Sequence, residues 1–193
     1  MGMLVVLVIA VGLLFWIVGA YNGLIALKNR VLNAWKQIDV QLKRRHDLIP
    51  NLINTVKGAM NFERETLEAV ISARNKAIGA QSQGVAATAK AEGELTQVLG
   101  KLFALTEAYP DLKATGNIAQ LQEELTSTEN KISFARQLYN DEATLYNTKQ
   151  AQFPTNMVAG MAKASSAELW QIEDAGERAV PNVDLSFNKP PSA

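Results

Sequence analysis

Hydrophobic residues run without interruption at the start of the chain and afterwards recur at helical spacing. From Met3 to Ala20 no residue carries a charge. As a helix this stretch spans roughly 27 Å, just short of the ~30 Å hydrocarbon core of a bilayer. Trp16 and Tyr21 lie toward its end, where amphipathic rings favour the lipid–water boundary. The pattern predicts a transmembrane anchor over residues 1–24.

A cleaved signal peptide is the alternative interpretation of this segment. Val18-Gly19-Ala20 resembles a small-residue cleavage site, but no Lys or Arg precedes the apolar run, and the run is longer than a usual signal core. Basic residues follow it instead: Lys28, Arg30, Lys36, Lys43, Arg44 and Arg45. The positive-inside bias therefore predicts a single pass, with the N-terminus outside and the C-terminal domain in the cytoplasm.

Behind the anchor, a stripe of apolar residues continues at steps of three, four or seven. No turn signal separates it from the anchor, so we expect one unbroken helix that leaves the bilayer. Pro50 lies inside this helix and predicts a kink or a local break. The stripe consists of Leu24, Leu27, Val31, Trp35, Ile38, Leu42, Ile49, Ile53 and Val56.

Further helical stripes follow over residues 62–78, 85–105 and 118–145, the last of which includes Leu138 and Leu145. Asn61 with Gly58, Gly79 with Gly84, and Tyr109-Pro110-Asp111 are the turn signals between them. Whether the first turn falls at Gly58 or only at Gly79 stays open. No stretch has the period-two alternation of a strand.

The predicted fold is all-α: a transmembrane helix that continues into a long-helix antiparallel four-helix bundle. We assign residues 1–24 to the anchor, 25–152 to the bundle and 153–193 to short C-terminal helices and an extended tail. The boundary at residue 153 follows from Phe153-Pro154, and the residues from Val180 to Phe187 are typical of an extended end.

Composition excludes several kinds of chemistry. The 19 basic residues balance the 19 acidic ones, so charge predicts no nucleic-acid partner. There is no cysteine, which excludes disulfides, thiolate metal sites and cysteine nucleophiles. A single histidine, His46, argues against a multi-histidine metal centre, and no glycine-rich loop precedes a Lys-Ser or Lys-Thr pair. We therefore expect no catalytic residue, no cofactor, no metal and no small-molecule substrate.

The densest polar cluster is Lys43-Arg44-Arg45-His46-Asp47, a candidate surface for a partner or for self-association. A straight helix would hold it roughly 30 Å from the bilayer, some three Debye lengths away, so lipid is not its expected partner. The alternative is a solvated flank of a long helix. His46 also lies on the apolar stripe, where a histidine is usually buried and bonded to a carboxylate or to the backbone. Candidate carboxylates are Asp47, Glu124, Glu129 and Asp141.

Two further sets of residues are candidate contact surfaces. Gly12, Gly19 and Gly23 offer small side chains for packing between anchors, although glycine is also common in membrane helices. Met157, Met161 and Trp170 are candidates for lipid or partner contact, since methionine and tryptophan suit adaptable apolar surfaces. The alternative is that these residues cap the bundle core.

Several motifs resemble the LemA family of bacterial membrane proteins over nearly the whole length. They are Tyr21-Asn22-Gly23-Leu24, Asn29-Arg30-Val31, Asn33-Ala34-Trp35, the run IDVQLKRRHDLIPNL from Ile38 to Leu52, Ala108-Tyr109-Pro110-Asp111-Leu112-Lys113, Gln122-Glu123-Glu124-Leu125 and the closing stretch from Pro181 to Phe187. The resemblance implies a single-pass protein of the inner membrane with a four-helix up-and-down bundle, and it favours the turn near Gly58. The family has no established enzymatic activity, and its genes often lie beside those of membrane metalloproteases.

The function we expect is that of a non-enzymatic scaffold, anchored in the bacterial inner membrane, that self-associates into a homo-oligomer and organises or shapes the membrane. The amide-rich helix faces motivate this expectation, because amides form hydrogen bonds across an interface without repulsion between copies. The alternative is an adaptor or regulator of another membrane protein, such as a membrane protease or a sensor kinase. The expected partners are further copies of the chain, membrane lipid and such a membrane protein.

Overall fold

The computed structural model describes residues 1–57, 64–107 and 116–171, and within them every regular element is helical. The helices are α1 (Gly2–Lys57), α2 (Arg64–Ala80), the short 3₁₀ helix η1 (Gln81–Gln83), α3 (Val85–Glu107), α5 (Gly116–Ala151) and α6 (Asn156–Ala159). The all-α prediction is confirmed. The turn signals at Gly58, Asn61 and Tyr109-Pro110-Asp111 and the extended end from Val180 to Phe187 lie outside the described residues.

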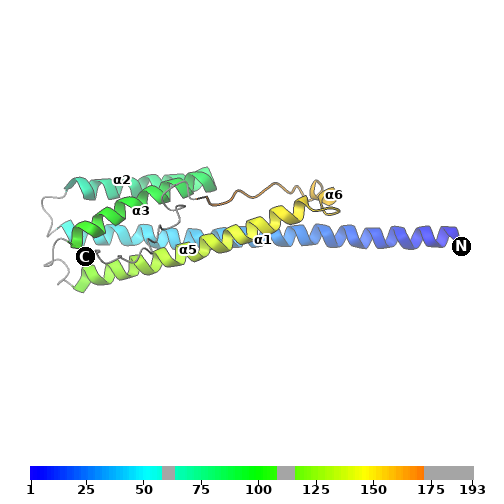
Figure 1. Cartoon of the computed structure of the whole chain (residues 1–193), viewed down its shortest axis with the longest axis horizontal. Helices are drawn as coiled ribbons and strands as arrows, with labels where there is room; N and C mark the ends of the chain where they lie inside the picture. The colour runs from blue at the N-terminus through cyan, green and yellow to red at the C-terminus, as the bar shows by residue number, and fades with distance from the viewer. Residues whose placement is uncertain (58–63, 108–115, 172–193) are drawn as a thin grey trace, which may run out of the picture.

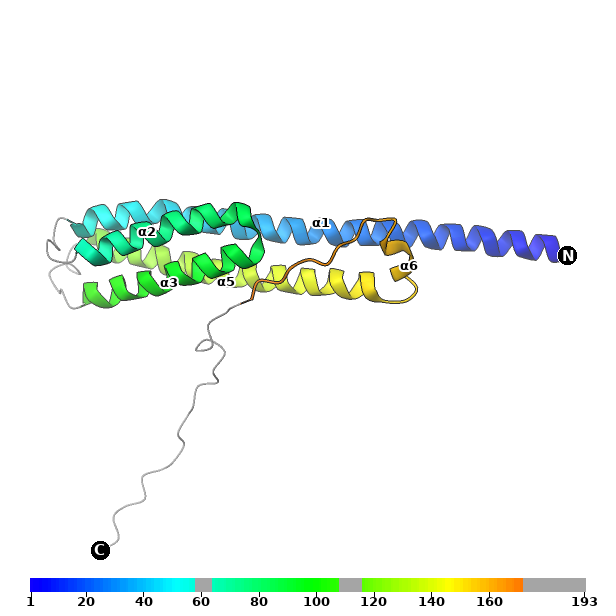
Figure 2. The same cartoon turned by 90° about the horizontal axis from the view of Figure 1, so that it is seen from above.

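The helix α1 is the spine of the molecule (Figure 1). The helix α5 runs antiparallel beside it, and the α2–α3 hairpin packs on this pair only over the half that is remote from the N-terminus (Figures 1 and 2). The predicted four-helix bundle is thus confirmed, with α1, α2, α3 and α5 as its members. We call the half with four helices the distal half, and the half of the bundle nearer the anchor the proximal half.

Each half has a hydrophobic core of its own. The distal core is aliphatic and draws on all four helices: Ile49, Leu52, Ile53, Val56, Leu67, Val70, Ala77, Ala80, Ala91, Leu95, Leu99, Leu102, Ile118 and Leu125. The proximal core lies mainly between α1 and α5 and contains Leu24, Val31, Ala34, Ile38, Leu42, Ala89, Ile132, Ala135, Tyr139, Ala143, Tyr146, Ala162 and Trp170. The stripe predicted for α1 contributes residues to both cores.

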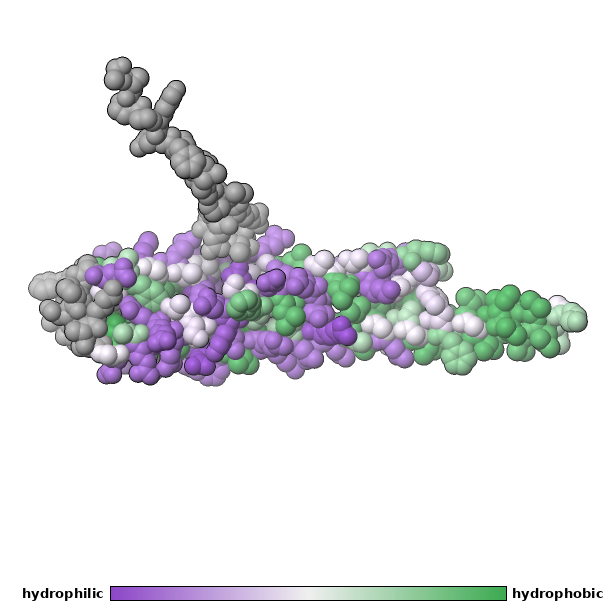
Figure 3. Space-filling view, turned by 60° about the horizontal axis from the view of Figure 1, so that its bottom comes forward, coloured by the Kyte–Doolittle hydropathy of each residue, from purple (hydrophilic) through white to green (hydrophobic). Residues whose placement is uncertain are grey.

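The expected unbroken helix is present, since α1 extends from Gly2 to Lys57. Pro50 lies within it without interrupting it, so the local break anticipated there is wrong. Among the described residues, α1 is the one helix long and apolar enough to cross a membrane, and its apolar window is entirely exposed. Figure 3 shows this segment as an apolar rod that projects from the bundle. Leu24 is the first buried residue of the chain.

After α6 the chain turns over residues 160–163 and then returns along α5 as an extended segment, residues 164–171, which we call the strap (Figure 2). Two asparagines of α5 hold its backbone. Asn147 donates from Nδ2 to the carbonyl of Ala167 at 2.8 Å and accepts from the amide of Ala167 at 2.8 Å. Asn140 does the same with Trp170, at 3.0 and 2.9 Å. The side-chain amides therefore replace the strand partner that an isolated extended segment lacks.

Candidate functional site

The basic segment from Lys43 to Asp47 is divided between solvent and interior. Lys43, Arg44 and Asp47 are exposed, whereas Arg45 is 2% and His46 3% exposed. Treating all five as one contact surface was therefore wrong for Arg45 and His46. The reason is helical spacing: these two residues follow the buried Leu42 by three and four positions, which places them on the core-facing side.

The exposed members of this segment make local ion pairs. Lys43 Nζ donates to Asp47 Oδ2 at 2.6 Å, and this hydrogen bond holds the pKa of the Asp47 carboxyl below its ordinary value. Arg44 Nη2 lies 3.8 Å from Glu124 Oε2 of α5. Exposed pairs of this kind contribute little to stability, about 0–1 kcal/mol.

Arg45 is the centre of a buried ionic cluster that joins three helices. Its Nη1 donates to Glu92 Oε2 of α3 at 3.2 Å. Its Nη2 donates to Thr96 Oγ1 at 2.6 Å and lies 3.2 Å from Glu129 Oε2 of α5. Because the guanidinium engages α3 and α5 together, it fixes both helices against α1 at one height along the bundle.

His46 completes the cluster. Its Nε2 lies 2.8 Å from Glu92 Oε1, and both side chains are buried. A buried histidine bonded to a carboxylate or to the backbone was predicted. The partner is a carboxylate, that of Glu92, and none of the candidates Asp47, Glu124, Glu129 or Asp141. The available signal was that Glu92 stands three residues before Leu95, on the apolar stripe of its own helix.

Pro50 adds a fourth helix to this site. Proline has no amide hydrogen, so the carbonyl four residues earlier, that of His46, loses its partner within α1. Arg74 of α2 supplies the missing donor: its Nε donates to the His46 carbonyl at 2.7 Å. The helix continues through Pro50 because the freed acceptor is satisfied from outside.

The cluster is suited to holding helices together. Arg45, His46 and Glu92 face one another in the interior, whereas Glu129 is partly exposed. Removing one partner of a buried pair typically costs about 3–5 kcal/mol. Within the described ranges, no three residues of the types His, Cys, Asp and Glu come together as a group that could hold a metal ion. The cluster lies at the junction of the two cores, between Leu42 of the proximal core and Ile49 of the distal core.

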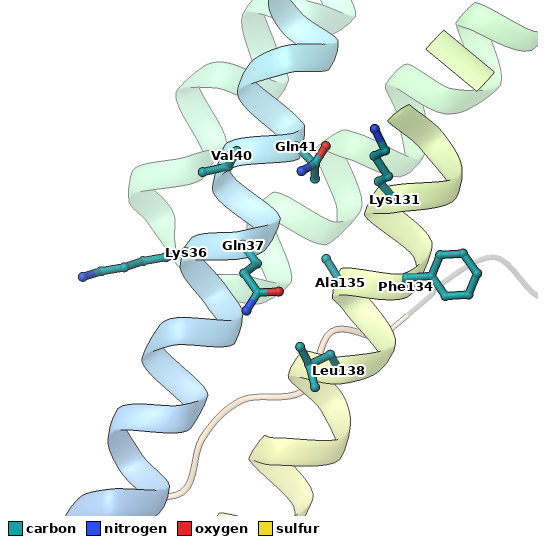
Figure 4. Close-up of a pocket in the computed structure, with 8 residues that line it drawn as sticks. All are labelled: Lys36, Gln37, Val40, Gln41, Lys131, Phe134, Ala135 and Leu138. Carbon is teal, nitrogen blue, oxygen red and sulfur yellow. The ribbon is translucent and has the colours of Figure 1, made fainter. Parts of the chain in front are cut away.

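A groove between α1 and α5 is a second candidate site, on the surface (Figure 4). It encloses about 440 Å³ and is lined by Lys36, Gln37, Val40 and Gln41 of α1 and by Lys131, Phe134, Ala135 and Leu138 of α5. Phe134 is 72% exposed at its edge. The side-chain oxygen of Gln41 is buried there without a hydrogen-bond partner. Val40 on the other edge is 63% exposed, so the described residues leave this face open to solvent.

Comparison with known proteins adds to this geometry. The sequence profile of the LemA family matches residues 34–185, which include most of the bundle and the strap. The chain belongs to the LemA family. It is 27% identical to the protein LemA of Metamycoplasma hominis over 168 residues, which cover 86% of this chain and 76% of that protein.

Relatives of the LemA-family chain also include magnetosome proteins. It is 22% identical to the magnetosome protein MamQ 2 of Paramagnetospirillum magneticum and 19% identical to MamQ of Magnetospirillum gryphiswaldense, each over 181 residues. These alignments cover 81% of this chain and 66% of each MamQ protein. Together with the exposed apolar helix, these relatives indicate a membrane-associated protein.

The glycines of the anchor and the two methionines near α6 were also candidate contact residues in this LemA-family chain. A side chain added at Gly12, Gly19 or Gly23 would meet nothing within 4 Å, so a role in packing anchors together stays a prediction. Met157 and Met161 are exposed on and beside α6.

Trp170 is a correction to the prediction of a lipid or partner contact. It is 4% exposed, and its ring lies 6.0 Å from that of Trp35, with the guanidinium of Arg136 5.2 Å from the ring centre. The strap carries this residue into the proximal core, where its ring is shielded from lipid. The alternative of a cap on the bundle core is the one that the structure shows.

Proposed function

We propose that this chain is a non-enzymatic scaffold, anchored in the bacterial inner membrane, that self-associates through the groove between α1 and α5 and organises the membrane. The observation that carries the proposal is an apolar stripe left bare on α5. Phe134, Leu138 and Leu145 recur at steps of four and seven and are all exposed. Leu138 and Leu145 belong to the apolar stripe predicted for this helix, and their exposure marks a helix face that lacks its partner.

The opposite side of the groove continues this surface. Val40 of α1 is exposed beside Gln37 and Gln41, which carry no charge. A helix of a second copy that entered the groove would cover the exposed side chains of Phe134 and Val40. Burial of apolar area stabilises such a contact by about 25 cal/mol per Å² before the costs of association.

The anchor favours contacts between copies. Because α1 is continuous from the membrane segment into the bundle, every copy presents the groove at the same height and in the same orientation to the bilayer. Confinement to a plane raises the effective concentration of one groove near another. A symmetry axis relating such copies must be parallel to the membrane normal, which permits closed rings or extended arrays according to the angle between neighbours.

The orientation in the membrane is part of the same proposal. The basic residues that follow the anchor favour a cytoplasmic bundle. The Lys43–Asp47 segment lies roughly 30 Å along α1 from Leu24, so its exposed charges face neighbouring proteins and not the bilayer of their own anchor. These charges also suit the alternative function, an adaptor that contacts another membrane protein.

Gentle extraction of the full chain, followed by mass measurement in solution, tests self-association. Particles well above the chain mass of 21.0 kDa, beyond the contribution of detergent, are expected. Phe134→Glu with Val40→Glu should shift them toward the monomer. The matched control is Ile71→Glu, which changes an exposed apolar residue of α2 outside the groove. A wild-type chain that stays monomeric at high concentration would contradict the proposal.

A further inference from the structure

The pairing of α1 and α5 fixes where α5 ends relative to the membrane anchor. The rings of Trp35 and Tyr139 lie 5.4 Å apart, and Arg45 pairs with Glu129. Both contacts fit one antiparallel register: Arg45 lies ten residues after Trp35 on α1, and its partner Glu129 lies ten residues before Tyr139 on α5. Extending that register toward the N-terminus by eleven residues from Trp35 brings Leu24 level with Gln150, in the last turn of α5.

The turn that follows α5 therefore lies at the height at which α1 leaves its apolar segment. α6 contacts α1, and Ile17 and Ala20 are partly buried on the same face of α1 as Leu24. Figures 1 and 2 show α6 beside α1, at the base of the projecting rod. A bilayer crossed by α1 up to about residue 24 would have its surface at this turn.

The turn presents apolar side chains outward as well as inward. Thr155, Val158 and Ala162 are buried beneath it. Phe153, Met157 and Met161, at steps of four, are 80%, 71% and 68% exposed. The apolar surface at this end of the bundle adjoins that of the projecting helix (Figure 3). Large apolar side chains so exposed in water gain free energy by transfer to the headgroup–acyl boundary.

Charge favours an anionic bilayer as the occupant of this surface. Residues 1–30 and 144–167, which form this end of the molecule, contain no Asp or Glu. They contain four basic side chains, Lys28, Arg30, Lys149 and Lys163. Basic residues held at a membrane surface are attracted by anionic headgroups. A second copy presenting this same surface would bring like charges together, so lipid fits it better than self-association does.

The geometry points to a second membrane contact: the turn from Phe153 to Met161 enters the interface of the bilayer that α1 crosses. The chain is then held at two places, one transmembrane and one interfacial, and the bundle is fixed in tilt as well as in position. Phe153 joins Met157 and Met161 in this contact, and Trp170 has no part in it. The inference requires that α1 crosses the bilayer, and it does not depend on self-association.

Site-directed spin labelling tests this contact, and the absence of cysteine makes each introduced label unique. The full chain carries Phe153→Cys, Met157→Cys or Met161→Cys and is reconstituted in vesicles of phosphatidylcholine and phosphatidylglycerol. Accessibility to a water-soluble nickel relaxant should fall several-fold relative to the exposed control Ile71→Cys on α2, while accessibility to oxygen rises. Leu7→Cys, in the middle of the apolar segment, reports on the anchor itself.

The possible results distinguish a lipid contact from contact with a second copy and from no contact at all. Labels at 153, 157 and 161 that are as accessible to nickel as the label at 71, with the label at 7 shielded, would overturn the inference while leaving the anchor intact. Shielding accompanied by spin–spin broadening that disappears on dilution with unlabelled chain would assign the surface to a second copy, and would also overturn it. Shielding from nickel with raised accessibility to oxygen, and without spin–spin broadening in the undiluted sample, supports the lipid contact.

Discussion

The distal and proximal halves of the bundle cover their hydrophobic cores in different ways. In the distal half, four helices surround an aliphatic core. In the proximal half, α2 and α3 are absent over most of the length, and one extended strap and the aromatic rings of Trp35, Tyr139 and Trp170 do the covering. A strap buries less area than two helices and cannot satisfy its own backbone, so this half needs asparagine side chains that the distal half does not.

The ionic cluster stands where the two halves meet. It consists of Arg45, His46, Glu92, Thr96 and Glu129 and joins α1 to α3 and α5. Hydrophobic packing specifies position along a bundle weakly, whereas a guanidinium with partners on two helices specifies one register. The largest consequences for both halves are therefore expected from breaking this junction.

The first change is Glu92→Leu, which leaves Arg45 and His46 buried without their shared carboxylate. We expect a loss of about 3–5 kcal/mol in the free energy of unfolding, measured by denaturant titration of the full chain in detergent. The control Glu94→Ala, two residues away and partly exposed in a pair with Lys76, should cost about 1 kcal/mol or less. Equal losses for the two variants would show that the junction has no special role.

The second change is Trp170→Ala, which removes the strap's main contribution to the proximal core. Deleting a buried aromatic side chain costs about 3–5 kcal/mol, and near a segment end the cost should approach the lower figure because the strap can detach. Hydrogen exchange should therefore accelerate around residues 139–150 and stay unchanged around Leu95 and Leu102. Uniform acceleration in both halves would mean that the two cores are not separable.

The third change, Asn147→Ala, removes one asparagine clamp but leaves Trp170 in place. It deletes two hydrogen bonds to Ala167, each worth about 0.5–1.5 kcal/mol net. We expect faster proteolysis within the strap, with cleavage followed by mass spectrometry. Thr148→Ala, at an exposed position one residue further along α5, is the matched control. Indistinguishable cleavage rates for the two variants would show that Asn147 does not hold the strap in place.

The smallest expected effect comes from Asp39 of α1. Partial burial raises the pKa of its carboxyl above the ordinary value of 3.8. The folded chain therefore holds this proton more tightly than the unfolded chain, so the group's contribution to stability declines as pH rises from 3.8 through the raised pKa. Asp39→Asn should be slightly more stable than wild type at neutral pH, with the difference shrinking in acid. Parallel pH profiles of unfolding for the two chains would contradict this.

Local periodicity explains how much of the fold could be predicted. The stripe from Leu24 to Val56 repeats at helical spacing, and the structure buries Leu24, Ile38, Leu42, Ile49 and Val56 as that spacing requires. The same rule failed after Phe153. Apolar residues there fit a helix by spacing, yet only Asn156–Ala159 is helical before the strap begins, because two asparagines far back in the sequence bind its backbone.

The candidate site was predictable only in part for the same reason. That His46 is buried followed from its place between Leu42 and Ile49. That its partner is Glu92 depends on how α3 docks against α1, which residue spacing within one helix does not specify. Pro50 leaves the His46 carbonyl without its helical donor, so the sequence predicts that some other group donates to it. It does not predict that the donor is Arg74 of α2.

Photo-crosslinking from the groove tests the central claim, self-association through the α1–α5 face, most directly. Phe134 is replaced by p-benzoylphenylalanine in the full chain, and intact cells are irradiated. The account predicts a product of twice the chain mass that contains this chain alone, lost with Val40→Glu and retained with Ile71→Glu. Irradiation that yields only monomer, or a product containing a different membrane protein, would contradict it and, in the second case, favour the adaptor.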